Sequence, residues 1–136
     1  MHLLDAGVWI AIADPDDRYH AEAHAIAAEV EQPLAALDLT LYEVTNVMGH
    51  KKKQPREGRF LLRLIKKRCR DNLHLLAADP DLLESALELS AEHGLTAYDA
   101  AYVATARRYG WTLVSTDIAD LVSRGLAVTP DAADYP

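Results

Sequence analysis

The chain has 136 residues, and half of them are hydrophobic, which excludes an intrinsically disordered protein. This length is typical of one folded domain, which we expect to span residues 1–136. No apolar run approaches the roughly 18 residues that cross a bilayer, and the N-terminal stretch has no basic region, so we expect neither a membrane span nor a signal peptide. The net charge is −7, and the single cysteine, Cys69, excludes an intramolecular disulfide, which fits a cytoplasmic protein.

Short apolar runs alternate with longer helical patterns along the chain. In chain order the first half predicts a strand at 2–5, a helix at 17–31, a strand at 34–38, a helix that begins at Thr40 and a basic helix at about 56–70. The second half predicts a strand at 73–77, a helix from Pro80 to His93, a helix from about Thr96 to Gly110, a strand at 111–116, a short helix at 117–125 and an edge strand at 126–129. This alternation predicts an α/β fold in three layers, a parallel sheet sandwiched between helices.

The charge is unevenly distributed. Between Lys51 and Arg70 lie ten of the fourteen basic residues and one acid, a net charge of +9, whereas the remainder carries four basic residues against twenty acids, a net charge of −16. One basic stretch on an acidic body indicates that a polyanion or an acidic partner meets one face of the protein.

Four acidic residues are predicted to meet at one edge of the sheet. Asp5 ends the first strand and Asp117 closely follows the strand at 111–116, while Glu43 and Asp99 lie near the starts of two helices. In an open α/β sheet, ligands bind at the carboxyl ends of the strands, which is where these four carboxylates are expected.

Each acid also has a purely structural interpretation. Thr40 with Glu43, and Thr96 with Asp99, fit the capping-box spacing at a helix start, and Asp117 suits an N-cap. Capping, however, does not require the acids to gather where several strands end. No Lys or Arg lies within the four motifs, so a hard divalent cation such as Mg²⁺ or Mn²⁺ is the expected partner of clustered carboxylates. Such a site activates water and stabilises charge on a phosphodiester.

The stretches that contain the four acids resemble those of the PIN-domain ribonucleases. In the length of the chain and the order of these stretches, the resemblance is to the VapC-type toxins of VapBC toxin–antitoxin pairs. The resemblance covers nearly the whole chain and rests on LLDAGVWIA, LTLYEVTNV and LTAYDAAYVATARRYG running into WTLVSTD. It implies a PIN-like three-layer fold, Mg²⁺-dependent endonucleolytic cleavage of RNA, a homodimer, and inhibition by a small cognate antitoxin.

The same resemblance implies roles for particular residues. Asp5, Glu43, Asp99 and Asp117 correspond to the catalytic, metal-binding acids, and Thr116 to a hydroxyl that supports them. The family commonly has a hydroxyl residue directly after the first acid, whereas Ala6 and Gly7 stand here, so hydrogen bonding around Asp5 is expected to differ. Asp120 is expected to face solvent.

The basic stretch is the expected RNA-binding surface, because Lys and Arg neutralise phosphates. A solvated helix face that docks on the core is compatible with this role. The residues expected to bind RNA are Lys51, Lys52, Lys53, Arg56, Arg59 and Arg63. Four further large side chains are expected in the core or at a dimer interface rather than stacked on bases, namely Trp9, Tyr42, Met48 and Tyr102.

Three alternatives remain open from the sequence. A housekeeping PIN-domain RNA-processing nuclease would use the same chemistry. A non-catalytic RNA-binding module would tolerate neutralisation of the four acids. A phospho-receiver is a poorer fit, because receivers generally pair adjacent acids after the first strand and supply a late lysine, whereas no lysine follows Lys67.

Overall fold

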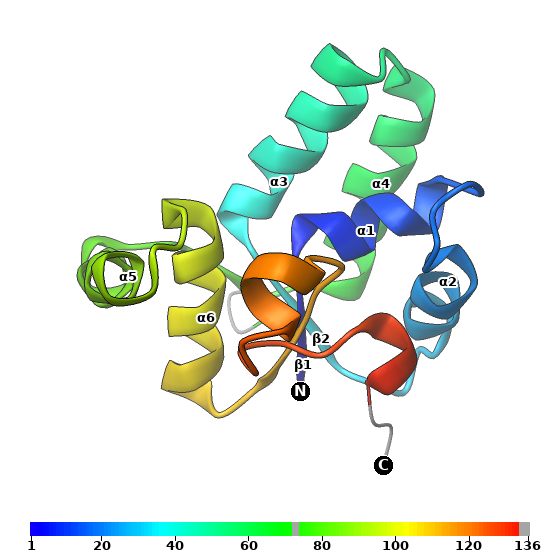
Figure 1. Cartoon of the computed structure of the whole chain (residues 1–136). Helices are drawn as coiled ribbons and strands as arrows, with labels where there is room; N and C mark the ends of the chain where they lie inside the picture. The colour runs from blue at the N-terminus through cyan, green and yellow to red at the C-terminus, as the bar shows by residue number, and fades with distance from the viewer. Residues whose placement is uncertain (72–73, 134–136) are drawn as a thin grey trace.

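The computed structural model describes residues 1–71 and 74–133, and within them four strands form one parallel sheet (Figure 1). Their order is β3-β2-β1-β4, with β1 central beside β2 and β4. The strands are β1 (His2–Leu4), β2 (Leu34–Leu37), β3 (Leu75–Leu76) and β4 (Thr112–Val114). Leu3 pairs in register with Ala35 on one side and with Leu113 on the other. The parallel sheet expected from the sequence is therefore confirmed.

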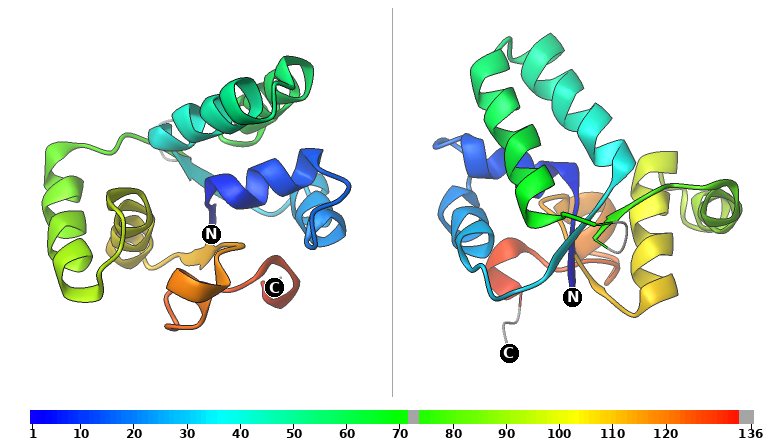
Figure 2. Two further views of the ribbon diagram at one scale, coloured as in Figure 1. Left: turned by 45° about the horizontal axis from the view of Figure 1, so that its top comes forward. Right: turned by 180° about the vertical axis from the view of Figure 1, so that it is seen from behind.

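Helices cover both faces of this sheet, which confirms the three-layer α/β/α arrangement (Figure 2). Alternate strand residues point to opposite faces: Leu4 and Leu34 pack with α1, α2 and α4, whereas Leu3 and Leu113 pack with α5 and α6. The helical elements are α1 (Ala6–Ala13), α2 (His20–Ala28), α3 (Asp38–Thr45), η1 (Asn46–Lys51), α4 (Pro55–Arg68), α5 (Pro80–His93), α6 (Ala97–Tyr109), η2 (Ile118–Val122) and η3 (Pro130–Ala132). No helix in the described ranges is long and apolar enough to cross a membrane.

The helix boundaries follow local capping chemistry. The Asp79 side chain accepts a hydrogen bond from the Leu82 amide at the start of α5, and Pro80 occupies the first turn. Gly94 and Gly110 end α5 and α6 in the left-handed conformation, each with φ of 67°, which glycine adopts without the steric cost of a Cβ. The Thr96 side chain caps the start of α6 in the same way, which fixes Asp99 in its first turn.

Several expected boundaries differ from the structure, among them the helix expected at 17–31, which is shorter as α2, and two differences have a clear physical reason. The helix expected from Thr40 begins at Asp38, whose carboxylate accepts a hydrogen bond from the amide of Ala78 at 3.1 Å, so a contact across the fold extends the helix backwards. The expected edge strand at 126–129 is only an isolated bridge between Val128 and Val114, and Pro130 follows it with no amide to donate. The strand expected at 73–77 is β3, and residue 73 lies outside the described part of the chain.

Helices α3 and α4 form a long hairpin that projects beyond the sheet (Figures 1 and 2). Gly58 of α4 lies so close to Met48 of η1 that a Cβ at Gly58 would approach the Met48 Cβ to 2.9 Å. Leu61 and Ile65 are fully buried on the same face of α4. This buried face fixes the hairpin to the body and leaves the opposite, basic face of α4 exposed.

Candidate active site

The four predicted acids lie at the carboxyl edge of the sheet. Asp5 directly follows β1, Glu43 lies in α3, Asp99 is in the first turn of α6, and Asp117 follows β4 and caps η2. Their charges act on one another: the negative charges of Asp99 and Glu43 raise the pKa of Asp5, and that of Asp117 raises the pKa of Asp99. The fold therefore brings carboxylates from four separate chain segments into one electrostatic group.

Asp5 is the buried member of the group, with 7% of its surface exposed. One carboxylate oxygen accepts a hydrogen bond from the Val8 amide at 3.1 Å, which caps α1, and the other accepts one from the Ser115 hydroxyl. Burial raises the pKa of Asp5 to about 7, although the hydrogen bonds from Ser115 and Val8 oppose the shift. These hydrogen bonds thus hold the carboxylate in place, but they do not offset the free-energy cost of burying its negative charge.

Glu43 is held by a hydroxyl chain from α6. The Tyr102 hydroxyl donates to a Glu43 carboxylate oxygen at 2.9 Å and lies 2.5 Å from the Thr40 hydroxyl. Burial is the largest cause that raises the pKa of Glu43, and the nearby Asp99 raises it further. The capping box considered for Thr40 does not form, because Thr40 lies inside α3 and its side chain bonds to Tyr102 instead.

Asp99, Asp117 and Asp120 form the more open part of the group. Carboxylate oxygens of the three lie within 4.8 Å of one another. The Thr96 hydroxyl caps α6 by accepting from the Asp99 amide at 3.1 Å, so the cap does not consume the Asp99 carboxylate. Asp120 is exposed as expected, yet it lies within this cluster, and its carboxylate is 3.9 Å from the Arg124 guanidinium.

The donor set fits a hard divalent cation. It consists of carboxylate oxygens alone, and the pKa values of Asp5, Glu43 and Asp99 are all raised, first by burial and then by the negative charges of neighbouring carboxylates. Mg²⁺ and Mn²⁺ prefer oxygen ligands, and a cation at this place would relieve the repulsion that raises these pKa values. Among the described residues, Asp99, Asp117 and Asp120 bring carboxylate oxygens close enough together to share such an ion, and Asp5 and Glu43 are coupled electrostatically to Asp99.

The hydroxyl that contacts Asp5 comes from Ser115, which the sequence analysis did not select. Ser115 is fully buried, donates to Asp5, and accepts from the Asp117 amide at 3.0 Å, so it links two of the acids. Thr116 was the expected supporting residue, and its role stays a prediction. Two consecutive hydroxyl residues follow β4, and the sequence does not show which of the two contacts Asp5.

Thr116 lies against Gly7, at the position where this chain departs from the family pattern. A Cβ at Gly7 would come 2.5 Å from the Thr116 hydroxyl oxygen and 3.4 Å from a carboxylate oxygen of Asp5. The absence of a side chain at Gly7 thus leaves room for the hydroxyl of Thr116 beside the first acid.

The variant Gly7→Ala is therefore expected to lower the free energy of unfolding by roughly 1–2 kcal/mol. Steric overpacking of about 1–3 kcal/mol outweighs the gain of up to about 1 kcal/mol from alanine in a helix. Adding Thr116→Ala should recover most of this loss, because it removes the crowded oxygen. Denaturant unfolding of both single variants and the double variant measures the coupling, and strictly additive effects would contradict the contact.

The six residues expected to bind RNA lie in different surroundings. Lys51 lines a groove together with Glu43, whereas Lys52 forms an ion pair at 2.9 Å with Asp14, the residue that directly follows α1. Lys53 is exposed at the tip of the hairpin. The remaining expected RNA-binding residues project from the exposed face of α4, namely Arg56, Arg59 and Arg63. Of these six, Lys51 lines the same groove as Glu43, one of the four acids.

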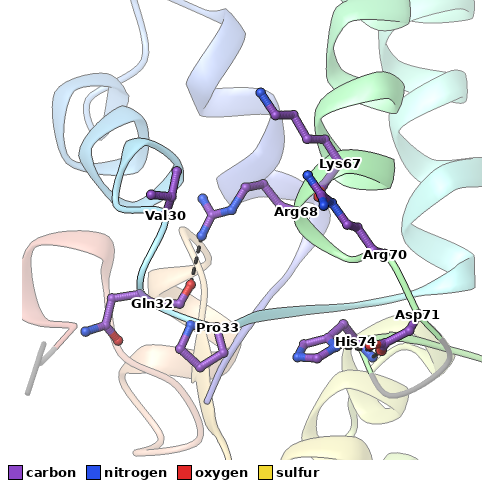
Figure 3. A pocket seen from close by; sticks show the side chains of 8 residues that line it. All are labelled: Val30, Gln32, Pro33, Lys67, Arg68, Arg70, Asp71 and His74. Carbon is purple, nitrogen blue, oxygen red and sulfur yellow. Dashed lines mark hydrogen bonds and ion pairs between the residues drawn. The ribbon is translucent and has the colours of Figure 1, made fainter.

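The C-terminal end of the basic stretch has a structural role. Figure 3 shows Arg68 reaching across to the loop after α2, where its guanidinium donates to the carbonyls of Glu29 at 3.0 Å and Gln32 at 2.8 Å. Lys67, Arg70 and His74 line the same pocket, of about 370 Å³, where β2 and β3 begin. This pocket lies at the amino ends of the strands, so it is separate from the acidic edge.

Comparison with known proteins identifies the family. The PIN domain model matches residues 2–121. Ribonuclease VapC3 of Pyrobaculum aerophilum is 31% identical over 120 residues, which cover 85% of this chain and 88% of that protein. Among solved structures, PAE2754 from the same organism has a TM-score of 0.68 at 26% identity, covering 96% of this chain and 90% of that one. A toxin–antitoxin complex from Klebsiella pneumoniae has a TM-score of 0.68 at 24% identity, covering 96% and 98%. The chain belongs to the PIN-domain family, in its VapC ribonuclease branch.

Proposed function

We propose that this protein is a Mg²⁺- or Mn²⁺-dependent endoribonuclease that hydrolyses RNA phosphodiester bonds. The observation that carries the proposal is the group of carboxylates at the sheet edge, in which Asp5 is buried and its pKa is raised to about 7. A bound divalent cation would supply charge neutralisation at the scissile phosphate and lower the pKa of an attacking water. Family membership and the 31% identity to Ribonuclease VapC3 support the same activity.

In this proposal the chain's own residues hold the carboxylates in fixed positions. Asp5 and Asp99 are the main ligands, and Asp117 and Glu43 complete the set. Val8 and Ser115 fix Asp5, and the Tyr102 hydroxyl orients Glu43 from α6. Such fixed orientation is what catalysis by a preorganised charged site requires.

We further propose that the protein is the toxin of a type II toxin–antitoxin system. In this proposal residues 1–136 form one PIN domain, and the protein acts as a homodimer in the cytoplasm. The structural similarity to a toxin–antitoxin complex from Klebsiella pneumoniae supports an antitoxin as partner. An antitoxin that supplies a cation to the acidic edge would inhibit the site by competing with the metal. A housekeeping RNA-processing nuclease is the alternative within the same chemistry.

Expression of the chain alone, followed by sequencing of new RNA 5′ ends, tests the toxin proposal. Growth arrest with discrete new ends, both absent for Asp99→Asn, is the expected result. Co-expression of a small open reading frame from directly upstream should restore growth. Undisturbed growth together with discrete new 5′ ends would favour the housekeeping alternative.

Ser115→Ala is expected to reduce RNA cleavage by roughly 10- to 100-fold, the effect typical of residues that orient metal ligands. The variant removes the donor to Asp5 and the acceptor for the Asp117 amide, so two acids lose their alignment. Thr116→Ala, one position along the chain, is the matched comparison and should have the smaller effect. The larger loss at Thr116 would show that the hydroxyl implied by the family resemblance is the operative one.

A further inference from the structure

A groove of about 580 Å³ lies directly beside the acidic edge, between the hairpin and the start of α6. Its lining includes Tyr42, Glu43 and Asn46 from α3 and η1, together with Lys51 and Tyr98. One of the four acids therefore forms part of its wall. The volume is within the range of about 300–1,000 Å³ found for small-ligand sites, so a unit as large as a nucleotide fits.

The two tyrosines in this groove are unusually exposed for large aromatic residues. Tyr42 is 80% exposed, so it does not lie in the core, and its expected alternative place at a dimer interface stays a prediction; Tyr98 is 58% exposed. By contrast, Trp9, Met48 and Tyr102 are buried in the core, as expected. Exposed rings at a site edge offer stacking surface that the fold itself does not use.

Each exposed tyrosine directly precedes one of the four acids in sequence. Tyr42 precedes Glu43 in α3, and Tyr98 precedes Asp99 in α6. Consecutive residues on a helix point about 100° apart. The acid can therefore face the sheet edge while its neighbouring tyrosine faces the groove, so the same helical turns that position the acids also position the rings.

The groove combines apolar and polar groups, because Leu39 and Val47 line it together with the two tyrosines and the polar side chains. Aromatic rings stack on nucleobases of any sequence, and Lys51 is the groove's cation, suited to a phosphate. RNA bases become available for stacking where the strand is unpaired, because the edges and faces of paired bases are covered. An uncharged apolar partner would leave Lys51 and Asn46 unused.

We propose that Tyr42 and Tyr98 stack on a base of single-stranded RNA next to the cleaved phosphodiester, with Lys51 contacting the adjoining phosphate. This inference rests on the proposed ribonuclease function and deepens it. It makes these two rings determinants of where the strand is cut.

The test compares cleavage of one single-stranded RNA oligonucleotide by wild type, Tyr42→Ala and Tyr98→Ala, with Tyr42→Phe and Tyr98→Phe as conservative variants. Loss of a stacked base should lower kcat/KM by roughly 5- to 150-fold, mainly through KM, and the phenylalanine variants should retain activity because they keep the ring. Tyr109→Ala is the matched control, since Tyr109 is 46% exposed at the other end of α6 and stacks on Trp111 instead. The same sequence annealed into a duplex should be cut poorly.

A binding arm separates this inference from the proposed function. Fluorescence anisotropy of labelled single-stranded RNA with EDTA present measures affinity without cleavage, and both alanine variants should bind more weakly than wild type. Tight RNA binding by wild type that both alanine variants weaken would support the inference, whether or not wild type cuts RNA. A wild type that binds RNA in this way but does not cut it would refute only the proposed function. Active alanine variants with unchanged KM and affinity would overturn the inference alone. A shift from dimer to monomer for Tyr42→Ala in sedimentation would also overturn it, because Tyr42 would then contact a second copy of the chain.

Discussion

Replacing Asp5 with asparagine is expected to abolish RNA cleavage while leaving the protein at least as stable as wild type. Asparagine has nearly the same shape and keeps an oxygen that can accept from the Val8 amide, so the cap of α1 survives. It removes a buried carboxylate whose pKa is raised to about 7. Without this negative charge, the site attracts a divalent cation less strongly. The loss of activity should be roughly 10²- to 10³-fold or larger, as for other groups that stabilise charge at a reacting centre.

Steady-state cleavage and thermal unfolding, measured on the same preparations, check both halves of this result. Asp16→Asn is the control, because Asp16 is an exposed acid in the turn after α1. It should change neither property. Full activity of Asp5→Asn would remove Asp5 from the site, and a large drop in its melting temperature would show that the carboxylate has mainly a structural role.

In metal-free solution, the free energy of unfolding is expected to fall as the pH rises from about 4 to about 7. The unfolded chain releases the Asp5 proton near the ordinary pKa of 3.8, whereas the folded chain keeps it until about 7. Between these values the folded state binds more protons, so raising the pH favours unfolding. A shift of this size corresponds to about 4 kcal/mol for Asp5, and the raised pKa values of Glu43 and Asp99 act in the same direction.

Denaturant unfolding in EDTA across this pH range measures the effect, with Asp5→Asn as the reference. The difference in unfolding free energy between the two proteins should grow with pH and level off above 7. Addition of Mg²⁺ at pH 7 should stabilise wild type, because the ion binds the folded state, and should stabilise Asp5→Asn less. A difference that does not change with pH would contradict the burial of an uncompensated carboxylate at Asp5.

The features that the sequence predicted well are those determined locally. Helix α5 was expected from Pro80 to His93 and has these bounds, because its cap, its first-turn proline and its terminal glycine are all neighbours in the chain. The four acids could be assigned to one edge for a related reason. Strand ends and helix starts can be recognised locally, and the parallel topology then brings them together.

The features that the sequence missed depend on contacts between distant segments. The side-chain hydrogen bond of Ser115 to Asp5 and that of Tyr102 to Glu43 join residues 110 and 59 positions apart, so no local pattern marks them. The early start of α3 likewise depends on the contact between Asp38 and Ala78. Whether Tyr42 lies in the core or on the surface could not be decided from the sequence, because an aromatic residue has the same local pattern in either place.

Cleavage of single-stranded RNA by the purified protein, with Mg²⁺ and with EDTA, tests the central claim most directly. The account predicts cleavage with Mg²⁺, its loss in EDTA, its recovery when Mg²⁺ or Mn²⁺ is added back, and its absence for Asp99→Asn under every condition. Undiminished cleavage in EDTA, or by Asp99→Asn, would contradict the assignment of the acidic edge as a metal-dependent ribonuclease site.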